Sequence, residues 1–179
     1  MKGDGAMTLY RIWMFIAVGI LGLAGMATSA RITAQSSEAV LNASDAQKLL
    51  PSAVYFRGQS APTQLRNSGG VKFANGNYML ATLVDSSGYA NAIASNYQAY
   101  LVTEEPIKIN GENLPAGVYG AGFRAGDKFV VMDVGAHDVL TVNFAVDTAM
   151  KRPTPLQVLP DPGGGFRLYE GRDYVHFSR

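Results

Sequence analysis

The chain has 179 residues, of which 47% are hydrophobic and 16% charged, and its formal net charge is +1. This balance argues against a nucleic-acid partner, whose phosphates require clustered positive charge. The sequence contains no cysteine, which excludes disulfides, thiol catalysis and a lipid-modified cysteine. Its two histidines leave little for a zinc or copper site, so the sequence indicates no metal and no cofactor.

The first 30 residues have the pattern of a secretory signal peptide. Basic residues precede an uncharged apolar run at residues 12–27, and small residues follow it at positions 28–30. We expect cleavage after Ala30 and export to the periplasm or the outside of the cell. The alternative is an uncleaved anchor, but the run is shorter than the roughly 20 residues of a spanning helix. Met1 and Met7 both remain candidate starts.

After this segment we expect a flexible lead-in at residues 31–43 and a single β-domain at residues 44–179. Residues 44–47 fit a capping box, in which Ser44 accepts a backbone N–H and Gln47 reaches back to the serine amide. The sequence therefore predicts one short helix before the first strand, ended by Pro51.

From Val54 onward, short stretches of β-forming residues alternate with turn residues. Residues 78–84 are apolar on both faces, which predicts a central strand covered on both sides, whereas residues 60–70 are expected to form a loop. The spacing predicts an all-β fold, an antiparallel β-sandwich or barrel. Further strands are expected at residues 54–59, 71–73, 97–103, 128–134, 139–146, 156–159, 166–170 and 173–177. If Val134 pairs with Val139, one face of their hairpin is apolar and the other is partly wet. The apolar face then carries Phe129, Val131, Leu140, Val142 and Phe144, and the wetter face carries Thr141 and Asn143.

The stretch from Ile107 to Phe123 predicts a hairpin, a corner and a new strand. Asn110 and Gly111 fit a type I′ turn, whose two central residues both need a positive φ. Pro115 ends the ladder because it has no N–H to donate, and Gly117 lets the chain bend. We expect Gly117 to need a conformation that only glycine reaches at low cost.

Within this stretch, Asn110-Gly111 and Leu114-Pro115-Ala116-Gly117-Val118-Tyr119-Gly120 are followed by a Gly-Asp turn and Lys128-Phe129-Val130-Val131-Met132-Asp133. These segments resemble uncharacterised exported β-proteins of acidobacterial type. They are also similar to a family of domains of unknown function over about residues 106–134, although Val118 stands where that family usually has threonine. The resemblance implies export and a β-sandwich or barrel. It carries over no site residue, because the matched motif is structural.

The cluster that most resembles a catalytic site is Asp133, His137 and Asp138, since imidazole and carboxylate can bind a metal or pass a proton. A loop is favoured instead, in which Asp138 accepts backbone N–H groups and His137 is solvated. The serines lack a Gly-x-Ser-x-Gly elbow. Adjacent carboxylates at Glu104 and Glu105 would point to opposite faces of a strand. We therefore predict no catalytic residue.

The last hairpin supplies the candidate ligand-binding residues. Gly171 fits the first central position of a two-residue II′ loop, which pairs Arg167 with His176 and Tyr169 with Tyr174. These four side chains share one face, and the opposite face is apolar. One interpretation is a solvated surface on which Arg167 stacks on a tyrosine. The other is a platform for a sugar ring or a peptide.

Three functions remain open from the sequence. The first is an exported, non-enzymatic binding or interaction module of the cell envelope, whose partner would be a glycan, a peptide or an envelope protein. The second is a structural assembly protein that pairs through an exposed strand edge. The third is a hydrolase whose site is assembled from loops. Membrane contact is expected only through the N-terminal segment, if it is uncleaved.

Overall fold

The computed structural model describes residues 37–56, 58–87 and 96–179. The expected signal peptide and the first part of the expected lead-in lie outside these residues. The described part consists almost entirely of antiparallel strands in two sheets, with one short helix. This confirms the prediction of an all-β antiparallel fold, in the form of a sandwich rather than a closed barrel.

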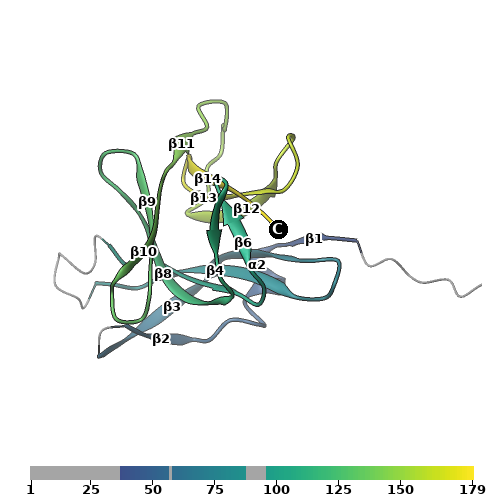
Figure 1. The fold of residues 1–179 in the computed structure, drawn as a ribbon. Helices are drawn as coiled ribbons and strands as arrows, with labels where there is room; N and C mark the ends of the chain where they lie inside the picture. The colour runs from purple at the N-terminus through teal and green to yellow at the C-terminus, as the bar shows by residue number, and fades with distance from the viewer. Residues whose placement is uncertain (1–36, 57, 88–95) are drawn as a thin grey trace, which may run out of the picture. The chain divides into compact units, whose positions relative to one another are not determined.

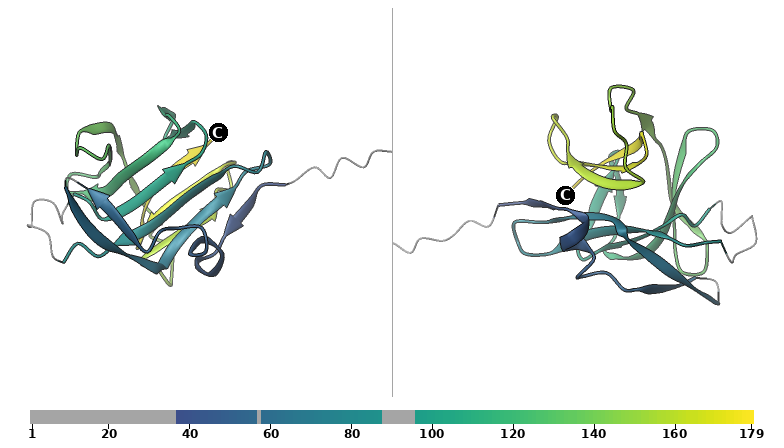
Figure 2. Two further views of the ribbon diagram at one scale, coloured as in Figure 1. Left: turned by 90° about the horizontal axis from the view of Figure 1, so that it is seen from below. Right: turned by 180° about the vertical axis from the view of Figure 1, so that it is seen from behind.

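The larger sheet has the strand order β1-β3-β4-β5-β8-β9-β10, and β2 pairs with β3 beside this path. Figure 2 shows its long strands lying side by side. The bounds are β1 Ala39–Leu41, β2 Ala53–Phe56, β3 Gln59–Lys72, β4 Tyr78–Val84, β5 Ala99–Thr103, β8 Gly117–Arg124, β9 Lys128–Met132 and β10 Asp138–Asn143.

The smaller sheet has the order β12-β13-β14-β6-β7, and β11 pairs with β14. In Figure 1, β12, β13 and β14 face the strands of the larger sheet. The bounds are β6 Ile107–Ile109, β7 Glu112–Leu114, β11 Ala145–Val146, β12 Leu156–Pro160, β13 Phe166–Glu170 and β14 Asp173–Ser178.

The main core lies between the two sheets, and both sheets contribute to it. Phe73 of the larger sheet's β3–β4 turn meets Phe166 of β13 edge to face, with ring centroids 6.5 Å apart. A second cluster lies on the other face of the larger sheet, where Phe56 stacks on Tyr97 at 4.0 Å. Strand β4 contributes Met79 to the first cluster and Val84 to the second. The prediction that this strand is covered on both sides is therefore confirmed.

The loop expected at residues 60–70 is wrong, because these residues belong to the long strand β3. An irregularity between Gln64 and Ser68 lets the strand bend while it stays paired with β4. Gly69 and Gly70 serve close packing rather than a turn. A Cβ on Gly69 would lie 3.1 Å from the backbone nitrogen of Val158, and one on Gly70 would overlap the carbonyl of Met79.

The expected helix exists but begins earlier and is shorter, since α2 spans Ala43–Ala46. Its N-cap is Asn42 rather than Ser44, and the Asn42 side chain accepts from the backbone N–H of Asp45 at 3.1 Å. The Ser44 hydroxyl donates to that same side chain. The short strand β1 precedes the helix and pairs with β3, so part of the expected lead-in is ordered in the sheet.

The turn between β6 and β7 has the predicted I′ character, because Asn110 has φ 49° and Gly111 has φ 90°. The chain then passes through Pro115 from the smaller sheet to β8 of the larger one, as the expected corner requires. The reason given for Gly117 is wrong, since its φ lies outside the left-handed region. A Cβ there would instead lie 2.8 Å from the hydroxyl of Tyr119.

The hairpin of β9 and β10 has the expected inner face in a different register. Val131 pairs with Leu140 and Phe129 with Val142, after an irregularity between Asp138 and Leu140. Compared with the expected pairing of Val134 with Val139, the observed pairing is shifted by two residues along the strand. Side chains alternate with period two, so the same residues still face the core.

Candidate functional site

The C-terminal hairpin of β13 and β14 has the register that the sequence predicts. Arg167 pairs with His176 and Tyr169 with Tyr174, and Gly171 in the turn has φ 63°. The apolar side of the hairpin lies in the main core, through Phe166, Leu168, Val175 and Phe177. The structure therefore brings the four predicted ligand-binding residues together on the outer face.

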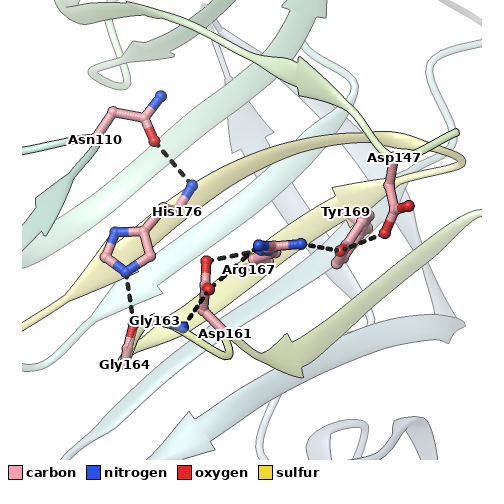
Figure 3. A network of polar contacts seen from close by, with 8 residues as sticks. All are labelled: Asn110, Asp147, Asp161, Gly163, Gly164, Arg167, Tyr169 and His176. Atoms are coloured by element: carbon pink, nitrogen blue, oxygen red, sulfur yellow. Dashed lines mark hydrogen bonds and ion pairs between the residues drawn. The ribbon is translucent and has the colours of Figure 1, made fainter. Parts of the chain in front are cut away.

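The centre of this face is the guanidinium of Arg167 (Figure 3). It binds the carboxylate of Asp161 in a fork, with Nε to Oδ2 at 2.7 Å and Nη2 to Oδ1 at 3.2 Å. Its Nη1 lies 3.4 Å from the hydroxyl of Tyr169. The guanidinium also lies over the ring of Tyr174, 4.5 Å from its centroid. The predicted stacking of Arg167 on a tyrosine is therefore present.

The other members of the face hold surrounding loops. Tyr169 is only 2% exposed, and its hydroxyl donates to Asp147 at 3.1 Å. His176 Nε2 lies 2.8 Å from the carbonyl oxygen of Gly164. Of the two tyrosines, only Tyr174 is partly exposed, and Arg167 covers one side of its ring. A planar ligand could therefore stack on little of either ring, because Tyr169 is buried and Arg167 covers one side of Tyr174.

The ionisable groups of this face are adjusted by their bonds. Hydrogen bonds from Arg167 and from the N–H of Gly163 hold the pKa of Asp161 below its usual value. Burial is the main reason why the pKa of Tyr169 is raised. The bonds to Asp161 and Tyr169 raise the pKa of Arg167 further. Each group is thereby kept in its ordinary state at neutral pH, as a structural network requires.

The cluster around His137 is a loop held by a carboxylate, but the carboxylate is Asp133 rather than Asp138. Asp133 Oδ1 accepts from the N–H groups of Gly135 and His137, at 2.8 and 2.9 Å. The hydrogen bonds from His137 lower the pKa of Asp133. The His137 side chain is 82% exposed, and Asp138 pairs with Arg124 at 3.2 Å.

The adjacent residues Glu104 and Glu105 lie in a bend after β5 rather than within a strand, so the strand alternation expected for their side chains does not apply. Glu104 accepts from the backbone N–H of Tyr78 at 2.9 Å. Glu105 accepts from the side chain of Asn75 at 2.6 Å and pairs with Arg179 at 2.8 Å. Among the described residues, no group of three or more His, Cys, Asp or Glu side chains could hold a metal ion. No helix in the described part of the chain is long and apolar enough to cross a membrane.

Beside the hairpin face lies a pocket of about 600 Å³ that the sequence did not reveal. It lies where β7 ends the smaller sheet and β10 ends the larger one. We call it the edge groove. Its lining is mostly polar and comprises Asn110, Glu112, Asn113, Lys128, Val139, Leu140, Thr141, Val142 and Asn143.

The edge groove is lined by backbone groups that no described strand pairs. Phe144 N donates to Asp127 O at 2.9 Å. In an antiparallel ladder every second residue directs its backbone N–H and C=O to the same neighbour, so the backbone groups of Val142 and Leu140 also point toward β9. Thr141 and Asn143 therefore direct their N–H and C=O groups away from β9, into the groove. In the β6–β7 hairpin, Ile109 and Glu112 flank the two-residue turn and bond each other through their backbones. The next residue, Asn113, therefore directs its backbone groups to the free side of β7.

Asn110 joins the hairpin face to the edge groove. Its Oδ1 accepts from the backbone N–H of His176 at 2.9 Å, and its Nδ2 donates to the carbonyl oxygen of Asn143 at 2.6 Å. The sequence predicted Asn110 only as a turn residue. Its amide side chain also fixes one end of the groove, which no local pattern indicates.

A second pocket of about 410 Å³ lies where the other two sheet edges approach each other. It is more apolar and is lined by residues of β1, α2, β3 and β12, among them Val40, Leu41 and Leu159. Strand β12 is preceded by Pro155 and ends at Pro160. Proline has no N–H to donate, so this edge is protected against further pairing.

No protein-family model matches the chain, and neither a curated protein nor a solved structure matches it.

Proposed function

We propose that the protein is an exported, non-enzymatic binding or interaction module of the cell envelope. The observation that carries this proposal is the edge groove, a polar pocket of about 600 Å³ between the last strands of the two sheets. Its volume is within the range of about 300–1,000 Å³ that ligand sites occupy. Its lining combines side-chain amides and hydroxyls with unpaired backbone groups, which are groups that recognise a ligand without reacting with it.

The polar side chains elsewhere support a binding role over a chemical one. Arg167, Asp161 and Asp133 are all engaged in bonds that hold loops. A general acid or base needs a pKa near the working pH, and the pKa shifts of Asp161 and Asp133 are in the opposite direction. Burial raises the pKa of Glu170 to about 7, but Glu170 does not line the edge groove. Assembly through a strand edge is the second candidate, and the unpaired edge of β10 favours it.

Export is tested by N-terminal sequencing of the protein recovered from the envelope and the medium of its native cells. The expected product begins just after Ala30. A product that keeps Met1 or Met7 would contradict cleavage.

Binding is tested by placing a photo-crosslinking amino acid at position 141, in the groove, and at position 148 as a matched control. Both are exposed threonines, but Thr148 does not line the groove. A specific adduct in the native cells is expected from position 141 alone. An adduct between two copies of this chain would favour assembly, and equal labelling from both positions would contradict the groove as the binding site.

A further inference from the structure

We propose that the edge groove binds an extended, uncharged polypeptide segment, which adds to β10 as an antiparallel strand. This inference rests on the proposed function and specifies its ligand class. Strand addition to a free sheet edge derives its affinity from main-chain hydrogen bonds and its specificity from alternate side chains. The edge groove provides both kinds of contact.

The main-chain contacts come from Thr141 and Asn143. Thr141 directs both its N–H and its C=O into the groove, so one residue of the added strand can exchange two hydrogen bonds with it. Asn143 has only its N–H available, because Asn110 already bonds its carbonyl. We therefore expect the added strand to be centred on Thr141, and its pairing to end near Asn143, where Asn110 occupies the carbonyl.

The side chains of β10 define the pattern of the ligand. Leu140 and Val142 belong to the main core and are each 8% exposed, whereas Val139, Thr141 and Asn143 are exposed on the other side. An added strand continues both faces, because its side chains alternate in the same way. Alternating apolar and small polar residues satisfy this requirement.

The charges of the groove favour an uncharged ligand. Its lining contains one cation, Lys128, and one anion, Glu112, beside neutral amides and a hydroxyl. The Lys128 ammonium donates to the side chain of Asn143 at 2.7 Å, so it is already engaged. The groove therefore has no excess of either charge that would attract a strongly acidic or strongly basic segment.

Among the strands at the ends of the described sheets, β10 is the longest, and no proline protects it. Strands β2 and β11, which pair beside the main paths, have only four and two residues. Strand β12 is bounded by prolines, and β1 and β7 contain only three residues each. Strand β10 contains six residues and no proline, and at roughly 3.3 Å per residue it spans about 20 Å. Its exposed side chains between residues 139 and 143 carry no charge, although charge is a usual protection of free edges.

The test measures amide hydrogen exchange by NMR on the isotopically labelled full chain. The probe is a blocked pentapeptide in which threonine and valine alternate. At saturation it should slow exchange of the Thr141 amide by about tenfold or more and slow that of Asn143 as well. The Leu140 and Val142 amides already bond β9 and should change little. The control peptide has an N-methyl group on the central residue, which removes the donor facing Thr141, and it should lose the effect.

A variant and a second ligand complete the test. Thr141→Pro removes an N–H that no described strand uses, and an edge position tolerates proline, so the chain should fold and fail to bind the pentapeptide. A tetramer of β-1,4-linked N-acetylglucosamine is the glycan probe. Binding of the glycan without the pentapeptide would overturn this inference and leave the proposed function standing. Binding of neither probe, with no specific adduct from position 141, would overturn both. Protection of Thr141 that depends on protein concentration alone would replace the peptide with a second copy of the chain.

Discussion

The side-chain amide of Asn110 donates to the backbone carbonyl of Asn143 at 2.6 Å, and so joins the β6–β7 turn of the smaller sheet to the edge strand of the larger one. The same side chain accepts from the N–H of His176 at 2.9 Å. Asn110 therefore meets the demands of a tight turn and ties that turn to strands β10 and β14. The end of the edge groove depends on this one residue.

We predict that Asn110→Gly destabilises the protein. Glycine keeps the positive φ of the turn, so the loss comes from the bonds to Asn143 and His176 and should be about 1–3 kcal/mol. The matched control is Asp127→Gly, since Asp127 also has a positive φ of 58° and its side chain makes no hydrogen bond within the described residues. Urea denaturation of both variants checks this. An equal change in the two free energies of unfolding would mean that the Asn110 bridge contributes nothing.

Gly117→Val should also destabilise the fold, by about 1–3 kcal/mol, because the added atoms displace the ring of Tyr119. That displacement breaks the bond from the Tyr119 hydroxyl to the carbonyl of Pro115, now 3.0 Å. A double-mutant cycle with Tyr119→Ala separates the causes. The cost of Gly117→Val should shrink when the ring is absent. An unchanged cost in that background would locate the strain in the backbone instead.

Glu170 gives the protein a pH-dependent stability. Burial, with a contribution from Asp173, raises the pKa of Glu170 to about 7. The folded state thus holds a proton that the unfolded state releases near pH 4.5, so stability falls as the pH rises from about 4.5 through 7. Glu170→Gln should add roughly 1–3 kcal/mol at pH 8 and almost nothing below pH 4.5.

Denaturant midpoints measured across this pH range for wild type and Glu170→Gln check the prediction. Asp173→Asn is the companion variant, because it removes only the smaller cause and should lower the pKa of Glu170 slightly. A Glu170→Gln effect that is independent of pH would show that the carboxyl group does not titrate near neutrality.

The two paired tyrosines should differ in their contribution to stability. Tyr169→Phe removes the hydroxyl that bonds Asp147 and Arg167, with a cost of about 1 kcal/mol. Tyr174→Phe keeps the ring beneath Arg167 and should change the free energy of unfolding by less than about 0.5 kcal/mol. Thermal denaturation of both variants provides the comparison, and the reverse order would contradict the network of Figure 3.

The same contrast decides how the hairpin face should be tested for binding. Tyr169→Ala would open a cavity, because Tyr169 is 2% exposed. It would therefore affect the fold as well as any ligand. Tyr174→Ala changes a partly exposed ring and is the better probe of a sugar or peptide platform. Retained binding to an envelope glycan in this variant would leave the face as a structural network.

Local pattern determined much of the architecture. The two-residue turns at Asn110-Gly111 and at Gly171 have the predicted positive φ values, because tight hairpins admit few backbone conformations. The alternation in the last hairpin predicted its register and its buried face, because side chains alternate with period two. Pro115 and Gly117 predicted a corner between strands, and the chain changes sheets there.

Only the tertiary structure decided which strands are edges and what the polar residues contact. The glycines at 69 and 70 indicated a turn by sequence, whereas in the structure they admit the backbone of Val158 and the carbonyl of Met79. The sequence placed Thr141 and Asn143 on a wetter side of their strand, but pairing partners distant in the chain left β10 at the end of its sheet. The Asn110 amide likewise reaches Asn143 across 33 residues. Such contacts depend on how the two sheets pack against each other. Residue periodicity cannot predict them, because it indicates only which side of each single strand is apolar.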